Sequence, residues 1–212
     1  MSNIYLNDVD KMFEKEIRQT ARRGYEHITY ARFADDIVIA INGHPALDWL
    51  IGKCYKMLSV ELEKLKVKMN IEKTKIVDVD KNETFVFLGF EYRKIVTNSK
   101  KKMVLIRPHK SKVRKYLAKI KEVMEENQNL NVVEMIAKLN PVIRGWINYF
   151  RIGHCSKLFN SLRQWTEKKV RRFQRKKQNR FGYGWKKWSS EKIYGIWGLY
   201  NDYSIRYYEA KA

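Results

Sequence analysis

The sequence has few of the residues that mark secreted, zinc-binding or membrane-spanning proteins. Its 212 residues include two cysteines, Cys54 and Cys155, and four histidines, and neither type shows the spacing of a structural zinc site. The chain has no run of about 18 or more apolar residues to span a bilayer, and its start lacks the pattern of a signal peptide. We therefore expect reduced thiols, no zinc, no membrane partner and a soluble cytoplasmic or organellar protein.

Acidic residues are scarce as well, but only in the C-terminal part. Lys and Arg number 44 against 23 Asp and Glu, a net charge of +21. Residues 1–90 carry 14 basic and 14 acidic side chains, whereas residues 91–212 carry 30 and 9. Such an excess repels itself in a compact state unless a polyanion neutralises it. Nucleic acid is the first candidate partner. An anionic membrane surface is a distant alternative, because the basic segment is rich in aromatic residues suited to bases.

Hydrophobic periodicity predicts an α+β fold for the first half of the chain. Apolar residues at helical spacing predict a helix over 5–18 and a longer one from Pro45 to Met69. Two apolar strands, 28–33 and 37–41, flank a short polar turn and predict a tight hairpin. Alternating β-branched and aromatic residues predict further strands, over residues 75–79, 84–94 and 103–107.

After Pro108 the pattern is helical. One helix follows Ser111, a second covers 131–139, a third starts at Pro141 and a fourth follows Ser156. Short connections between them predict an all-α bundle after the mixed part. We accordingly divide the chain into three parts, residues 1–98, 99–165 and 166–212.

Two adjacent carboxylates, Asp35 and Asp36, occupy the turn of the predicted hairpin. Asp is a common turn residue, and this role alone would explain the pair. The alternative is chemical, because carboxylates at the tip of a buried hairpin, beside the small Ala34, suit a hard divalent cation that bridges to substrate phosphates. The residues by themselves leave both interpretations open.

Residues 167–192 combine a dense positive charge with aromatic residues and have only Glu167 and Glu191 as acids. A solvated helix face beside an aromatic core is one interpretation. We favour RNA binding, because so few acids predict no internal ion-pair network, and because cations contact phosphates while aromatic planes stack on unpaired bases. With the basic residues of the helix after Ser111, the candidate RNA-binding set is Lys112, Arg114, Lys115, Lys119, Lys168, Lys169, Arg171, Arg172, Arg175, Lys176, Lys177, Arg180, Lys186 and Lys187.

Several segments, in order, resemble known proteins. Residues 30–39 (YARFADDIVI) resemble the catalytic hairpin of reverse transcriptases, and two later segments resemble the blocks that follow it in that family, 69–75 (MNIEKTK) and 87–90 (FLGF). Further segments resemble the maturase domain of group II intron-encoded proteins: 144–150 (RGWINYF), 184–188 (GWKKW) and 198–203 (GLYNDY).

This resemblance implies an RNA-directed DNA polymerase that also helps its intron RNA to fold and splice. It implies a partial polymerase palm followed by a thumb and maturase bundle, with Asp35 and Asp36 as the catalytic ligands of Mg²⁺. Lys73 would support the active site, and Gly89 would let the backbone approach the primer. The implied partners are group II intron RNA, a DNA target and a template-primer duplex.

The chain also departs from the family pattern. The fingers and the first half of the palm have no counterpart, and Asp8 and Asp10 lie on a helical pattern where an upstream catalytic carboxylate would need a strand. We therefore expect little or no polymerase activity from this chain alone. Two alternatives stay open: an RNA-binding maturase remnant, or half of a split polymerase completed by a second chain that carries the fingers and palm.

Overall fold

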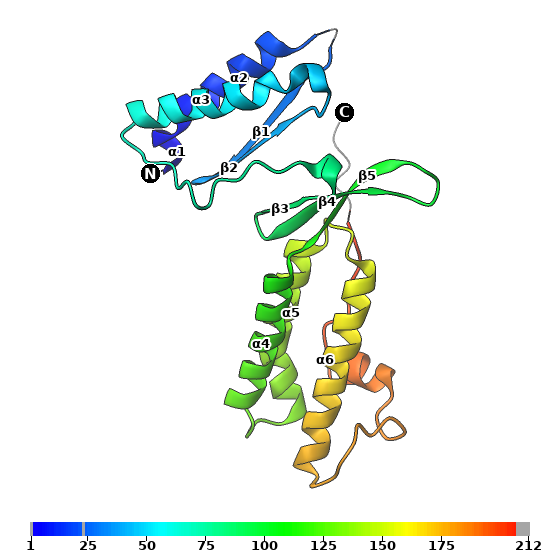
Figure 1. Cartoon of the computed structure of the whole chain (residues 1–212). Helices are drawn as coiled ribbons and strands as arrows, with labels where there is room; N and C mark the ends of the chain where they lie inside the picture. The colour runs from blue at the N-terminus through cyan, green and yellow to red at the C-terminus, as the bar shows by residue number, and fades with distance from the viewer. Residues whose placement is uncertain (1, 23, 207–212) are drawn as a thin grey trace. The chain divides into compact units, whose positions relative to one another are not determined.

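The computed structural model describes residues 2–22 and 24–206 (Figure 1). It divides into two compact units, Met1–Leu88 and Gly89–Ala212. This division falls earlier than the boundary that we placed at residue 98. The reason is a pair of hydrogen bonds within the second unit, where the N–H of His154 donates to the Ile106 carbonyl (2.6 Å) and the N–H of Ile106 donates to Nδ1 of His154 (3.1 Å). These bonds attach a β-hairpin to the helices that follow it.

The first unit packs helices against one face of a two-stranded hairpin. Ile28 pairs with Ile41 and Phe33 with Asp36 in the antiparallel register. Because side chains alternate along a strand, Ile28, Tyr30 and Arg32 share the face that the helices cover, and the ring of Phe13 stacks on Tyr30 at 4.7 Å. The elements are α1 (Ser2–Tyr5), α2 (Asn7–Thr20), β1 (Ile28–Phe33), β2 (Asp36–Ile41) and α3 (Trp49–Lys64).

The hairpin prediction is confirmed, whereas two predictions about its surroundings need correction. The long helix begins at Trp49 and ends at Lys64, because Pro45 lies in the 3₁₀ turn η1 (Pro45–Leu47). Residues 75–79 form no strand. Polar and exposed side chains surround them, and a second 3₁₀ turn, η2 (Val79–Lys81), leads to β3 (Thr84–Phe87).

The second unit joins an antiparallel hairpin to three long helices that lie side by side (Figure 1). In the hairpin, Phe90 pairs with Pro108 and Val96 with Lys102. The elements are β4 (Phe90–Val96), β5 (Lys102–Pro108), α4 (Lys110–Glu126), α5 (Val132–Phe150), α6 (Ser156–Lys177) and the π-helical turn η3 (Lys192–Ile196). Helix α6 runs unbroken through residues 165 and 166, where we had placed a boundary.

Helix α5 corrects the prediction of two helices separated at Pro141. It is continuous, with Pro141 inside it and a capping box at its start formed by Asn131 and Glu134. The buried face continues across the proline, with Leu139 before it and Ile143 after it. Packing of that face stabilises the helix more than the missing N–H of one exposed proline destabilises it.

Aromatic side chains fill the space between the three helices. The ring of Trp146 lies 4.8 Å from that of Tyr116 and 4.6 Å from that of Phe150, while Phe159 is buried beside them. The Tyr116 hydroxyl also lies 3.5 Å from Oγ1 of Thr166, which links α4 to α6. This core fixes the rotation of α4 and α6 about their axes, and so decides which of their basic residues face solvent.

Candidate nucleic-acid interface and palm hairpin

The two candidate catalytic carboxylates lie at the tip of the first hairpin. Ala34 and Asp35 form a two-residue turn, in which Ala34 has a φ of 56°, and Asp36 opens β2. Both carboxylates are exposed, which corrects the expectation of a buried hairpin tip. The reason is that α2 and α3 cover only one face of the hairpin.

The hairpin turn is braced by an ion pair that the sequence did not reveal. Asp10 on α2 accepts hydrogen bonds from Nε (2.7 Å) and Nη2 (2.5 Å) of Arg32, and from the Tyr30 hydroxyl (2.7 Å). Nη1 of Arg32 also donates to the Ala34 carbonyl at 2.8 Å. The only available signal was the alternation that puts Tyr30 and Arg32 on one face of β1. Asp10 is therefore a positioning residue for the turn that carries Asp35.

The protonation of this cluster follows from its geometry. The hydrogen bond from Arg32 lowers the pKa of Asp10 below its usual value, and burial raises that of Tyr30, with the Asp10 hydrogen bond adding to the rise. The Arg32 side chain is only 9% exposed. Removing the carboxylate would therefore leave a poorly hydrated guanidinium without its bidentate partner.

We expect Asp10→Ala to lower the stability of the first unit by about 2 kcal/mol, the order of a hydrogen bond to a charged group. Amide hydrogen exchange in α2 and β1 measures this unit separately. The pKa of Asp10 is lower in the folded state than its ordinary value of 3.8. The stability that the Asp10 carboxylate contributes to the first unit is therefore complete above pH 3.8 and is lost as the pH falls below that value. The difference in stability between wild type and Asp10→Ala should therefore shrink near pH 3. A difference that stays the same at that pH would contradict the Asp10–Arg32 ion pair.

A divalent metal does not fit the described residues of this chain by themselves. Carboxylate oxygens are suitable ligands for Mg²⁺, but Asp35 and Asp36 stand as a pair. Within residues 2–22 and 24–206 no group of three or more His, Cys, Asp or Glu side chains could hold a metal ion. Further ligands would have to come from another chain or from the substrate.

The two other palm residues have different surroundings. Gly89 has a φ of 79°, and a Cβ there would lie 2.8 Å from Cε of Lys112. Lys112 on α4 thus covers the glycine that we expected to approach a primer. Lys73 is exposed, its N–H donates to Asn70, and in the described part of the chain it forms no ion pair with Asp35 or Asp36. The roles of Lys73 and Gly89 stay predictions.

Helix α4 presents the first basic surface. The basic side chains of α4 that we predicted to bind RNA are all exposed, while Tyr116 and Ile120 are buried on the opposite face. Nζ of Lys119 lies 2.6 Å from the Glu122 carboxylate, and this hydrogen bond raises the pKa of Lys119. The exposed residues with the predicted RNA role are Lys112, Arg114, Lys115 and Lys119.

Helix α6 and the segment after it present the second basic surface. Lys169 and Arg175 are half-buried, with Nζ of Lys169 5.2 Å from the centre of the Trp165 ring and Nε of Arg175 donating to the Phe181 carbonyl (2.9 Å). Nζ of Lys177 donates to the Asn129 carbonyl (2.9 Å). The candidates exposed here are Lys168, Arg172, Lys176, Lys177, Arg180, Lys186 and Lys187.

Arg171 does not belong to this surface, and its assignment to RNA binding is wrong. Its side chain is 1% exposed, and it donates to one Glu167 oxygen from Nε (2.9 Å) and Nη2 (2.6 Å), and to the Trp188 carbonyl from Nη1. Glu167 also accepts from the hydroxyls of Ser190 and Tyr194, both at 3.0 Å. The expectation of no internal ion-pair network is therefore also wrong, because Glu167 is the centre of one.

The aromatic residues of 181–188 divide into buried and exposed members. Trp188 is buried and packs against Trp197, with ring centres 5.7 Å apart. Phe181 is 97% exposed and Trp185 52% exposed. One face of Trp185 lies 4.2 Å from the guanidinium carbon of Arg171. The segment thus contains the small aromatic core of the first interpretation, and it also exposes two rings; its RNA-binding role stays a prediction.

Comparison with known families agrees with this layout. Residues 1–92 match the family model described as reverse transcriptase (RNA-dependent DNA polymerase), and residues 113–194 match the group II intron maturase-specific domain. The first match contains the Asp35–Asp36 hairpin, and the second spans nearly all of α4 and the whole of α5 and α6. Polymerase-type and maturase-type segments in one chain define an intron-encoded protein.

The chain belongs to the group II intron reverse transcriptase/maturase family. This confirms the resemblance carried by the YARFADDIVI and RGWINYF segments. No curated protein matches the chain. Among the described residues, none of the helices has the length and apolar character needed to cross a membrane.

Proposed function

We propose that the chain binds group II intron RNA through the exposed cations of α4 and α6 and in this way assists splicing. The observation that carries the proposal is the unneutralised charge of α6. The acidic residue of α6, Glu167, forms its ion pair with the buried Arg171. Within the described residues, Lys168, Arg172 and Lys176 form no ion pair. Spaced four residues apart, these three lie in one row on the helix, where their charges are available to neutralise phosphates.

Two further features support RNA over another polyanion. Phe181 and Trp185 contact α6 through Arg175 and Arg171 and expose aromatic surface. Stacking on aromatic rings is the usual way in which proteins bind unpaired bases. The basic face of α4 would serve as the thumb-like contact to a duplex, where shape and phosphates are recognised. Such a partner would keep the protein in a ribonucleoprotein inside the cell or organelle.

A second candidate function is favoured by the hairpin. Asp35 and Asp36 are exposed on a turn that Arg32 and Asp10 brace, so their carboxylates are accessible to a complementing palm chain. In that case the two would contribute oxygen ligands for Mg²⁺, and the complete site would extend DNA along a template-primer duplex. The metal would supply activation of the attacking oxygen and stabilisation of the leaving one.

One double variant, compared with wild type, separates the two functions. For Asp35→Ala/Asp36→Ala we expect intron RNA affinity and splicing within about twofold of wild type, because the substitutions remove exposed negative charge from the unit without the basic surfaces. We expect no Mg²⁺-dependent primer extension from the wild-type chain alone. Filter binding, a splicing assay and primer extension measure these quantities.

The opposite results would be informative. Loss of splicing in the double variant, with its fold intact by circular dichroism, would contradict the maturase proposal. Primer extension by the wild-type chain alone that vanishes in the variant would show a complete polymerase site. Extension that needs a co-expressed fingers and palm chain, and again vanishes in the variant, would establish the second function.

A further inference from the structure

A groove in the second unit runs between α5 and the C-terminal segment, residues 198–206. Its larger hollow has a volume of about 750 Å³, and a second of about 500 Å³ adjoins it along α5. Both hollows share Arg144 and Asn148, so the groove continues from the C-terminal segment onto the face of α5, which alone lines the smaller hollow. The larger is lined by Arg144, Asn148, Arg151, Ile152, Tyr200, Asp202 and Arg206, and the smaller by Ala137, Asn140, Pro141, Arg144, Gly145 and Asn148.

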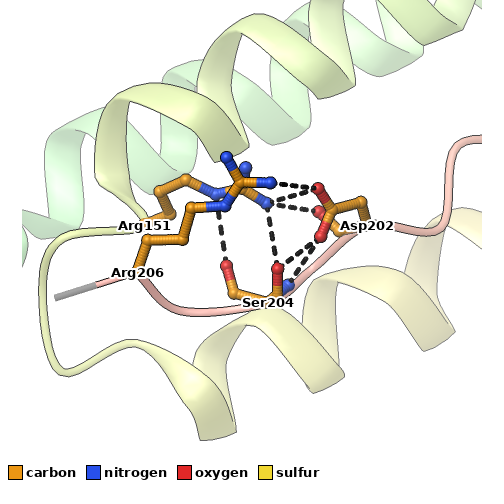
Figure 2. Close-up of polar contacts among 4 residues, drawn as sticks. All are labelled: Arg151, Asp202, Ser204 and Arg206. Carbon is orange, nitrogen blue, oxygen red and sulfur yellow. Dashed lines mark hydrogen bonds and ion pairs between the residues drawn. The ribbon is translucent and has the colours of Figure 1, made fainter.

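The wall opposite α5 is held in place at one end by Arg151 (Figure 2). Its guanidinium donates to the carbonyls of Asp202 (3.0 Å) and Ser204 (3.2 Å) and pairs with the Asp202 carboxylate at 2.8 Å. The N–H of Arg206 donates to the Arg151 carbonyl at 3.0 Å. Hydrogen bonds from Ser204 and Arg151 lower the pKa of Asp202 to about 2, so its carboxylate is charged at neutral pH.

Asn140 holds the other end of the same segment. Its Nδ2 donates to the Gly198 carbonyl and its Oδ1 accepts from the N–H of Tyr200, both at 2.9 Å. The groove is therefore formed before any ligand arrives, which reduces the entropy lost on binding.

The charge of the groove suits an anion. Arg151 neutralises Asp202, and Arg144 and Arg206 then contribute an excess of two positive charges. Both are exposed, although Arg206 lies within 3.6 Å of Asp202. The Arg144 guanidinium lies 5.7 Å from the centre of the Tyr200 ring, which combines a cation with an aromatic face as stacked nucleotides require.

The floor of the groove along α5 leaves open space at Gly145. Gly145 lies in the middle of a helix, where glycine is less stable than alanine by roughly 0.5–1 kcal/mol, yet a Cβ there would meet no atom within 4 Å. The described residues therefore do not require a glycine at this position. Pro141 has no N–H to donate to the Ala137 carbonyl. That carbonyl oxygen is therefore a candidate acceptor for a ligand.

We propose that this groove binds a single-stranded segment of RNA, an inference that rests on RNA being the partner. Arg144 and Arg206 contact phosphates, Tyr200 stacks on a base, and Asn148 and the Ala137 carbonyl contact base or ribose edges. The groove follows α5 from Ala137 to Asn148, about 16 Å at the rise of an α-helix, which suits several nucleotides. A duplex keeps its bases stacked inside and could present only its backbone to hollows of this size.

The experiment uses the full chain and a fluorescein-labelled ten-nucleotide oligouridine, with binding measured by fluorescence anisotropy at fixed salt. Gly145→Leu fills the groove, and Arg144→Gln removes one phosphate contact. We expect each to weaken binding about tenfold. Lys138→Gln is the matched control, because Lys138 is exposed on the same helix and lines neither hollow; we expect its affinity within twofold of wild type. Thermal unfolding should show no loss of stability in Gly145→Leu.

The outcomes are distinct. If both groove variants bind like Lys138→Gln, the groove proposal is overturned, while RNA binding through α4 and α6 stands as long as intron RNA still binds. If the wild type binds neither the oligonucleotide nor intron RNA, the proposed function fails and the groove proposal with it. Competition by duplex RNA as effective as that by single-stranded RNA would overturn the single-strand assignment. Should Gly145→Leu unfold, Arg144→Gln decides the result.

Discussion

Arg171→Ala is expected to lower the free energy of unfolding of the second unit by about 3–5 kcal/mol, the range for removing one member of a buried ion pair. The substitution leaves Glu167, itself buried, with two hydroxyl donors and without the cation of its ion pair. It also removes the donor to the Trp188 carbonyl and the cation beside Trp185. Urea unfolding followed by tryptophan fluorescence measures the loss, because Trp185 and Trp188 lie beside the substituted side chain.

Arg172→Ala is the matched control for this prediction. Arg172 is the next residue of the same helix and carries the same charge, but it is exposed. Exposed substitutions of this kind usually change stability by less than about 0.5 kcal/mol. We expect Arg172→Ala to unfold like wild type and to show its effect only in RNA affinity. A stability loss for Arg171→Ala no larger than that of Arg172→Ala would contradict the buried network.

This pair of arginines shows where sequence patterns stop being informative. The i and i+4 spacing of Glu167 and Arg171 was visible, and such pairs are common on solvated helix faces. Their burial depends on Trp188, Ser190 and Tyr194, which arrive from a later segment. Local periodicity therefore predicted Arg171 on the basic surface, whereas tertiary packing buries it.

The hairpin and the bundle were predictable because their signals are local. Alternation in residues 28–33 and helical spacing in residues 156–177 each report a buried face within one element. Pro141 led to a wrong prediction for the opposite reason. Proline usually begins or breaks a helix, but packing along the whole of α5 keeps that helix continuous through Pro141. The Asp10–Arg32 pair could not be predicted from spacing, because it joins a helix and a strand 22 residues apart.

The groove is the clearest case of tertiary assembly. The RGWINYF and GLYNDY segments were recognised separately, and neither suggested a ligand-binding role for Arg144 or Tyr200. Arg151 and Asn140 bring the two segments together through contacts that span more than 50 residues. The resemblance to the family was visible in the sequence. That the RGWINYF and GLYNDY segments lie on one surface follows from the hydrogen bonds of Arg151 and Asn140, which only the structure shows.

Neutralising the row on α6 should have the largest effect on RNA binding. For Lys168→Gln/Arg172→Gln/Lys176→Gln we expect the slope of log affinity against log salt to become shallower by about 2 to 3, since each phosphate contact contributes roughly 0.7–0.9. At about 0.1 M salt this corresponds to a loss of about two orders of magnitude in affinity. Filter binding of intron RNA across a salt series measures both quantities.

The control is a triple substitution of equal charge on α2, Lys11→Gln/Lys15→Gln/Arg18→Gln, whose members are exposed in the first unit. We expect its slope to match wild type, because that unit carries balanced charge and none of the proposed contacts. If the α6 variant keeps the wild-type slope, its row does not contact the phosphates. The same series on Lys112, Arg114 and Lys115 would then decide whether α4 is the RNA surface, because those cations are exposed on that helix.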